Sequence, residues 1–285
     1  MRFLKKLLPA RFRPEETVIP VIRLHGPIMA GGSQFRPAVN LANVAPLLQR
    51  AFDDKQAPAV AISINSPGGS PVQSRLIYRR IRDLALEKNK KVIVFVEDVA
   101  ASGGYMIAAA GDEIIADPSS IVGSIGVVSA GFGFVGLIEK LGVERRVYTA
   151  GSNKATLDPF QPEKESDIEH LKSLQLDIHD IFINLVKESR GDKLADDPDL
   201  FTGKFWSGVR GLDLGLVDEL TDMRSALKAR FGDKVKLRLV TAPKGFFGRR
   251  LPGALTRLEA GGLAAIAGEG LNALEERALW SRYGL

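Results

Sequence analysis

Segments dominated by apolar residues alternate along this chain with segments in which apolar residues recur every three or four positions. Residues 18–24, 59–64 and 92–96 are short and rich in β-branched side chains, which predicts buried strands. Helical spacing begins at Gln73, and a longer helical pattern with one apolar face covers 163–190. The alternation predicts an α/β fold with a largely parallel sheet.

Two further segments carry structural expectations. Residues 143–148 have the composition of a strand. Residues 118–138 are 21 positions without a charge, long enough to span a bilayer, but glycine and serine interrupt the apolar character. We therefore expect this segment to form a loop, a short strand and the start of a helix near the functional site.

One serine stands where a predicted strand turns into a helix. Ser102 lies in Ala-Ala-Ser-Gly-Gly-Tyr at 100–105, and residues 106–110 are small, apolar and compatible with a helix. The first N–H groups of a helix lack internal partners and point toward an anion formed nearby. Ser102 is thus a candidate nucleophile for acyl transfer, although a tightly packed turn would require the same small residues.

A pair of glycines follows the strand predicted at 59–64. The sequence Asn-Ser-Pro-Gly-Gly covers 65–69, and Gly68 and Gly69 allow the backbone to approach a ligand or to adopt positive φ. Their N–H groups could form an oxyanion hole, which stabilises the negative charge that develops during acyl transfer. An ordinary Pro-Gly turn is the alternative interpretation.

The candidate base is a lysine. The chain has no cysteine, no Gly-x-Ser-x-Gly motif and only three histidines, none in a segment that suggests a catalytic base. A serine–lysine pair is an established variant of triad chemistry. The lysine must be uncharged to accept a proton, which burial favours because it lowers a pKa of about 10.4. Lys154 lies among small neutral residues, whereas most other lysines lie in charged clusters; an ordinary loop lysine is the alternative.

Several blocks, taken in order, resemble the signature blocks of the signal peptide peptidase A family, the S49 serine peptidases. They are 65–69, 98–105 and 118–127, followed by 150–154, 201–204 and 211–218. The likeness covers roughly 17–240. It implies a ClpP/crotonase-like α/β fold built from ββα units, in a single catalytic domain.

The resemblance also implies roles for individual residues. Ser102 matches the nucleophile and Lys154 the general base, while Ser124 matches a serine that orients the lysine amine. Gly69 matches one oxyanion-hole donor, and a backbone N–H next to Ser102, at Gly103, is the expected second donor. The family completes its dyad between neighbouring subunits or tandem repeats, which implies that this chain forms a homo-oligomer.

Charge is concentrated at the N-terminus. Residues 1–13 carry five basic residues and no acidic one, which accounts for the whole net charge of +5. The balanced remainder argues against nucleic-acid binding. Apolar residues alternate with the basic ones, so a peripheral contact with an anionic membrane surface is expected, with a solvated tail as the alternative.

The expected organisation is a basic tail at 1–16, the peptidase domain at 17–240 and a helical extension at 241–285 that docks on a partner or a membrane. We expect no signal peptide and no transmembrane helix, although many bacterial members of the family begin with one, and therefore a cytoplasmic location, with contact at the inner face of the membrane. The acidic residues Asp112, Glu113, Asp117 and Asp158 are interpreted as solvated charges flanking strands, not a metal site.

The predicted function is that of a serine endopeptidase that needs no cofactor or metal. Its expected substrates are apolar peptides such as signal-peptide remnants, as the resemblance implies. Two alternatives stay open: a crotonase-type acyl-CoA enzyme, which would need an acidic catalytic pair, and a non-catalytic membrane-associated scaffold.

Overall fold

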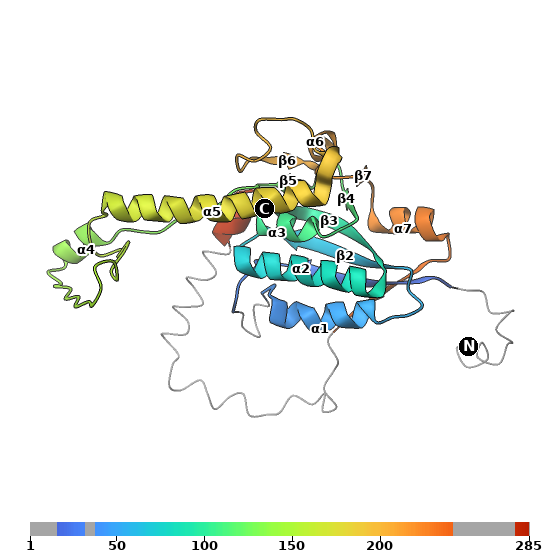
Figure 1. The fold of residues 1–285 in the computed structure, drawn as a ribbon, viewed down its shortest axis with the longest axis horizontal. Helices are drawn as coiled ribbons and strands as arrows, with labels where there is room; N and C mark the ends of the chain where they lie inside the picture. The colour runs from blue at the N-terminus through green and yellow to red at the C-terminus, as the bar shows by residue number, and fades with distance from the viewer. Residues whose placement is uncertain (1–15, 32–37, 242–276, 285) are drawn as a thin grey trace, which may run out of the picture.

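One sheet organises the protein. The computed structural model describes residues 16–31, 38–241 and 277–284. The sheet has eight strands in the order β6-β5-β3-β2-β1-β8, with β4 paired to β3 and to β7. Among the described strands every pairing is parallel except that of β5 with β6. The parallel α/β architecture predicted from the pattern is confirmed (Figure 1).

The strands have the following bounds: β1 Val18–His25, β2 Ala59–Ser66, β3 Lys91–Ala101, β4 Glu113–Ala116, β5 Ile121–Gly123, β6 Phe205–Ser207, β7 Glu219–Leu220 and β8 Lys236–Leu239. The α-helices are α1 Leu41–Phe52, α2 Pro71–Lys88, α3 Gly103–Ala108, α4 Val135–Lys140, α5 Glu165–Arg190, α6 Gly208–Asp213 and α7 Met223–Phe231. A 3₁₀ turn, Gly191–Lys193, follows α5.

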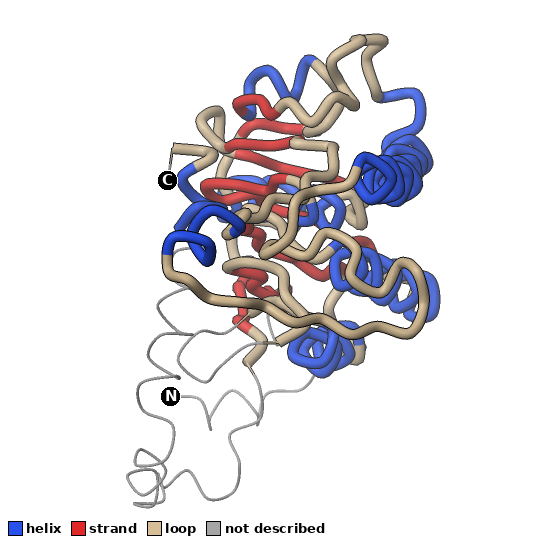
Figure 2. The backbone as a smooth tube through the Cα atoms, turned by 90° about the vertical axis from the view of Figure 1, so that its left-hand side faces the viewer, coloured by secondary structure: helices blue, strands red, loops and turns tan. Residues whose placement is uncertain are grey.

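The sheet buries both faces where its central strands lie. Alternate residues of β1, β2 and β3 contribute to a larger core with α1, α2, α3 and the last turns of α5. The intervening residues form a smaller core that α7 covers through Ala226 and Leu227. Burial on both sides explains why 59–64 and 92–96 read as nearly continuous apolar runs. With the view turned by 90°, helices line one side of the stacked strands (Figure 2).

Part of the chain leaves this body as an arm, defined here as residues 131–177. It contains α4, the connection from α4 to α5 and the first half of α5, and it extends beyond the sheet (Figure 1). The predicted helix at 163–190 is confirmed as α5, whose 26 residues make it about 39 Å long. The expectation for 118–138 is also confirmed, with β5 and the start of α4 in that segment.

The strand predicted at 143–148 is wrong. Residues 143–149 have no regular structure and lie exposed in the arm. Strand-like composition needs a neighbouring strand and a covered face to become a strand, and the described arm offers neither.

Expectations for the ends of the chain fall mostly outside the described residues, namely the basic segment 1–13 and most of 241–285. In the described portion, no helix combines the length and apolarity required to cross a bilayer.

Candidate functional site

The carboxyl ends of three adjacent parallel strands bring the predicted site residues together. Ala101 of β3 is in register with Gly123 of β5, so Ser102 and Ser124 leave neighbouring strands side by side. Ser66 at the end of β2 is in register with Ala100, which places the glycine pair on the other side of Ser102. Ligand sites in parallel α/β sheets form at this edge.

Ser102 is held in a sparsely populated backbone conformation. Its φ of 52° and ψ of −123° lie outside the helical and extended regions. Its N–H donates to the Gly123 carbonyl over 2.8 Å, and its own carbonyl accepts from the Met106 N–H over 3.0 Å. Bonds on both sides fix the turn. Such strained residues cluster at functional sites, where the surrounding structure over-determines them.

The glycine pair at 68–69 packs directly against this turn. A Cβ atom on Gly68 would lie 2.8 Å from the Ser102 Cβ, and one on Gly69 would lie 2.1 Å from the Ile28 carbonyl oxygen. Their φ values of +100° and +137° also favour glycine. Only glycine therefore lets the backbone approach the serine this closely.

Two N–H groups remain available beside the serine. Neither Gly69 nor Gly103 donates its N–H to any other described residue. Both residues line the same cavity as Ser102. Unpartnered N–H donors beside a hydroxyl are what an oxyanion hole requires.

Ser124, the other predicted support residue, repeats the geometry of Ser102. Its φ is also 52°, and its N–H donates to the Lys204 carbonyl over 2.7 Å. It lines the same cavity. Four of the five predicted site residues thus share one cavity: Gly69, Ser102, Gly103 and Ser124.

That cavity has a volume of about 770 Å³, and both apolar and polar residues line it. Met106, Val128 and Phe182 line it, and α5 and the segment around β6 contribute further residues. None of the described residues lining it is an aspartate or a glutamate. The cavity thus combines apolar side chains with the hydroxyls of Ser102 and Ser124 and the guanidinium of Arg282.

Lys154 is the predicted site residue that a single chain does not bring to the cavity. It is exposed in the segment that joins α4 to α5, and it does not line the cavity. Figure 1 shows this segment at the outer end of the arm.

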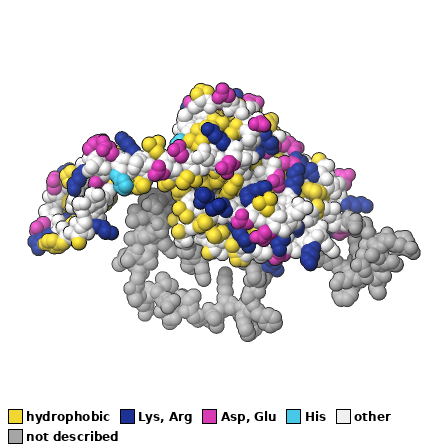
Figure 3. Space-filling view, in the orientation of Figure 1, with side chains coloured by type: hydrophobic (Ala, Val, Ile, Leu, Met, Phe, Trp, Pro, Cys, Tyr) yellow, Lys and Arg dark blue, Asp and Glu magenta, His cyan; other side chains and the backbone are white. Residues whose placement is uncertain are grey.

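The arm has its own internal contacts, but no other described part of the chain covers its outer surface. The Arg145 guanidinium pairs with the Asp158 carboxylate over 2.9 Å and lies 4.8 Å from the Phe160 ring centroid. Large apolar side chains on its surface remain exposed, among them Phe132 at 82% and Tyr148 at 89%. Hydrophobic side chains lie beside Lys and Arg at its outer end (Figure 3).

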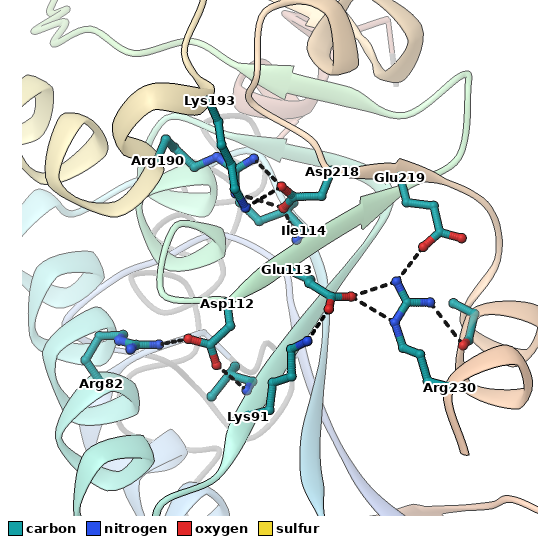
Figure 4. Close-up of polar contacts among 12 residues, drawn as sticks. Arg82, Lys91, Asp112, Glu113, Ile114, Arg190, Lys193, Asp218, Glu219 and Arg230 are labelled. Atoms are coloured by element: carbon teal, nitrogen blue, oxygen red, sulfur yellow. Dashed lines mark hydrogen bonds and ion pairs between the residues drawn. The ribbon is translucent and has the colours of Figure 1, made fainter. Parts of the chain in front are cut away.

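Ion pairs fasten the base of α5 to the sheet. The buried Arg190 forms a two-pronged pair with Asp218 over 2.8 and 2.9 Å, and Lys193 adds a third bond over 2.6 Å (Figure 4). Burial alone would raise the pKa of Asp218, but hydrogen bonds from Arg190, Lys193 and the Ile114 N–H together hold that pKa below its ordinary value. The arm therefore projects from a firmly anchored helix.

The four acidic residues interpreted as solvated charges differ in exposure. Asp112 and Asp117 are exposed and Glu113 is half-buried. The Asp158 side chain is only 5% exposed, which corrects the interpretation for Asp158. Two of the other three also form ion pairs. Asp112 accepts from the Val92 N–H and pairs with Arg82, and Glu113 pairs with Arg230 (Figure 4). No group of three potential ligands that could hold a metal occurs among the residues described.

Sequence reasoning missed some residues that line the cavity. His179 reaches the cavity from α5, and its Nε2 donates to the Ile125 carbonyl over 3.0 Å. Its position three residues before the buried Phe182 puts it on the inner face of the helix, a spacing that could have revealed it. Leu279, Arg282 and Tyr283 also line the cavity, and nothing in their local sequence indicated it.

The chain has relatives among known proteins. The family model described as peptidase family S49 matches residues 85–236. The chain is 66% identical to a Na(+)/H(+) antiporter NhaA of Brucella abortus over 99% of this chain and 39% of that protein. It is 32% identical to protease 4 of Haemophilus influenzae, over 73% of this chain and 34% of that protein. It is 31% identical to the chloroplastic serine protease SPPA of Arabidopsis thaliana, over 73% of this chain and 30% of that protein. The chain thus spans about two fifths or less of each of these relatives.

Proposed function

Because this chain belongs to peptidase family S49 and has its ClpP/crotonase-like α/β fold, we propose that it is a serine endopeptidase with Ser102 as nucleophile. The observation that carries the proposal is the strained Ser102 turn beside the free N–H groups of Gly69 and Gly103 in one cavity. In the reaction the Ser102 hydroxyl attacks a peptide carbonyl, and the two N–H groups stabilise the oxyanion. The intermediate then collapses: the peptide C–N bond breaks, and the amine product leaves with the proton that the base took from Ser102. Water, deprotonated by the same base, hydrolyses the acyl-enzyme, which frees the carboxylic acid product and restores the Ser102 hydroxyl.

The base in this proposal is Lys154 from a second copy of the chain. No lysine lines the cavity among the described residues, whereas Lys154 is exposed on an arm whose apolar surface lacks a cover. An arm docked on a neighbouring copy would bury that surface and bring the amine beside Ser124 and Ser102. Transfer into an apolar cavity favours the neutral amine, which can accept the serine proton.

The proposed substrates are apolar peptides, including remnants of signal peptides. Aliphatic and aromatic side chains form part of the cavity wall, and the small residues near Ser102 leave room for a peptide backbone to approach. Peripheral contact of residues 1–13 with anionic lipid would bring the enzyme to such peptides. The absence of an acidic pair among the described lining residues argues against the acyl-CoA alternative.

Complementation tests both the chemistry and the shared site. Ser102→Ala and Lys154→Ala should each abolish hydrolysis of an apolar fluorogenic peptide, whereas Lys140→Ala, on the same arm, should not. Mixing the two inactive variants should restore about one quarter of wild-type activity, because a random mixture pairs an intact serine with an intact lysine at one site in four. No recovery would contradict the shared dyad, and unchanged rates in both single variants would contradict the peptidase. Reaction with a serine-directed phosphonate separates the enzyme from a scaffold.

A further inference from the structure

The C-terminal segment, residues 277–284, lies on the cavity that contains Ser102. Residues 277–281 form a helical turn, and a further turn carries the chain to Gly284. Leu279, Arg282 and Tyr283 contribute to the same cavity wall as Ser102 and Gly69. The end of the chain is drawn in red beside the body (Figure 1).

Tyr283 makes the most specific contacts of this segment. Its hydroxyl donates toward the Ser124 Oγ over 3.3 Å and the Pro67 carbonyl oxygen over 3.5 Å. Its ring meets the Phe205 ring edge to face, with centroids 5.0 Å apart. In the described structure Ser124 Oγ has no other hydrogen-bond partner. Tyr283 thus takes the position that the proposed function gives to the lysine amine.

These contacts indicate that residues 277–284 would compete with a peptide for the cavity, and not be cut there as a substrate. The segment is helical, so it does not lay an extended backbone between Ser102 and the Gly69 N–H. The hydrogen bonds are long and therefore weak. Covalent attachment compensates, because a ligand on the same chain binds intramolecularly and its occupancy does not depend on its concentration in solution.

We propose that residues 277–284 act as a built-in competitor of the peptidase site. They occupy the place of an apolar peptide, and Tyr283 occupies the bond to Ser124 that the neighbouring copy's lysine needs. The positive charge of Arg282 at the cavity also opposes entry of the Lys154 ammonium group of a neighbouring copy. Peptide binding and docking of the arm of a second copy would both displace the segment. The proposal rests on the proposed function for its consequence, but the occupancy itself can be tested without catalysis.

The test uses full-length protein and point variants. Arg282→Ala removes a side chain at the cavity, and Arg277→Ala removes the same type of side chain from an exposed position of the same segment, which makes it the matched control. Tyr283→Ala removes the aromatic contact and the bond to Ser124, and Tyr283→Phe removes the bond alone. In a Ser102→Ala background, binding of a fluorescein-labelled apolar peptide is measured by anisotropy.

If the segment occupies the site nine tenths of the time, Tyr283→Ala should tighten peptide binding about tenfold, because apparent affinity scales with the open fraction. Arg282→Ala and Tyr283→Phe should give smaller gains, and Arg277→Ala should give none. With Ser102 intact, Tyr283→Ala should lower KM by the same factor and accelerate phosphonate labelling. Unchanged or weaker binding in Tyr283→Ala would overturn the proposal.

The two proposals fail separately. Tighter binding without hydrolysis in any Ser102-containing variant would leave the competitor standing and contradict the peptidase. Hydrolysis at the same rate with and without Tyr283 would support the peptidase and contradict the competitor. An equal gain from Arg277→Ala would indicate a general loosening of the segment and contradict specific occupancy of the cavity.

Discussion

The body and the arm of this protein differ in how completely one chain builds them. In the body, the backbone around Ser102 is fixed by the ends of three parallel strands. The glycine pair at 68–69 and the strained Ser124 lie next to it. In the arm, Lys154 is exposed, and nothing in the described chain covers the apolar side chains on the surface of the same arm. The proposed nucleophile and oxyanion donors are intrachain features, whereas the proposed base, Lys154, would reach them only through association of two copies.

This difference has a physical origin. In the body, strand pairing and burial in the core hold each backbone segment from several sides, which keeps even strained residues in place. The arm keeps contact with itself through pairs such as Arg145 with Asp158, but its outer surface gains no burial energy in a single chain. Apolar surface of this kind marks interaction sites.

The largest effect should come from Gly69→Ala in the body. The new Cβ would lie 2.1 Å from the Ile28 carbonyl oxygen, at a φ unsuitable for alanine, so the Gly69 N–H must move. Loss of one oxyanion donor should lower kcat by about 10²-fold or more. Steady-state kinetics with an apolar peptide substrate measure this fall in kcat.

The matched control is Gly136→Ala in α4 of the arm, where no atom lies within 4 Å of the added Cβ. It should change activity by less than about twofold, as surface substitutions do. Equal losses in both variants would remove the distinction between body and arm.

The next effect concerns the anchor of α5. Asp218→Asn leaves the buried Arg190 without its partner and should destabilise the protein by about 3 kcal/mol. The folded-state pKa of Asp218 lies below its unfolded value, so the pair stabilises fully above that value. Its contribution disappears as the pH falls below about 4. Urea unfolding at pH 7 and pH 3 measures both the loss and its pH dependence.

Glu144→Gln provides the comparison in the arm, because the Glu144–Arg146 pair is exposed. It should leave the free energy of unfolding unchanged within the error of the measurement, because exposed ion pairs contribute little to stability. A difference between Asp218→Asn and wild type that persists undiminished at pH 3 would show that the carboxylate is not the source of the stability.

The smallest effect is expected from the surface of the arm. Leu141→Ser should leave the unfolding of the body unchanged but weaken self-association about tenfold, because one buried leucine contributes about 1.5 kcal/mol. Sedimentation analysis over a concentration series measures it. Leu86→Ser, equally exposed on α2, serves as control. Parallel losses in both would show that the arm is not the interface.

The sequence alone indicated the central strands β1, β2 and β3, the helices α2, α3 and α5, and the small residues at the strand ends that contain Ser102. Those features depend on local patterns: apolar runs, helical periodicity and small residues at strand ends. It misassigned 143–148, because a strand needs a partner that composition cannot supply.

The tertiary structure decided which of these residues meet. Register between β3 and β5 puts Ser102 beside Ser124, and the direction of α5 carries the segment with Lys154 away from both. It also places Tyr283 beside Ser124, although 159 positions separate the two residues in the sequence. Such contacts arise from packing between distant segments, which no local pattern encodes.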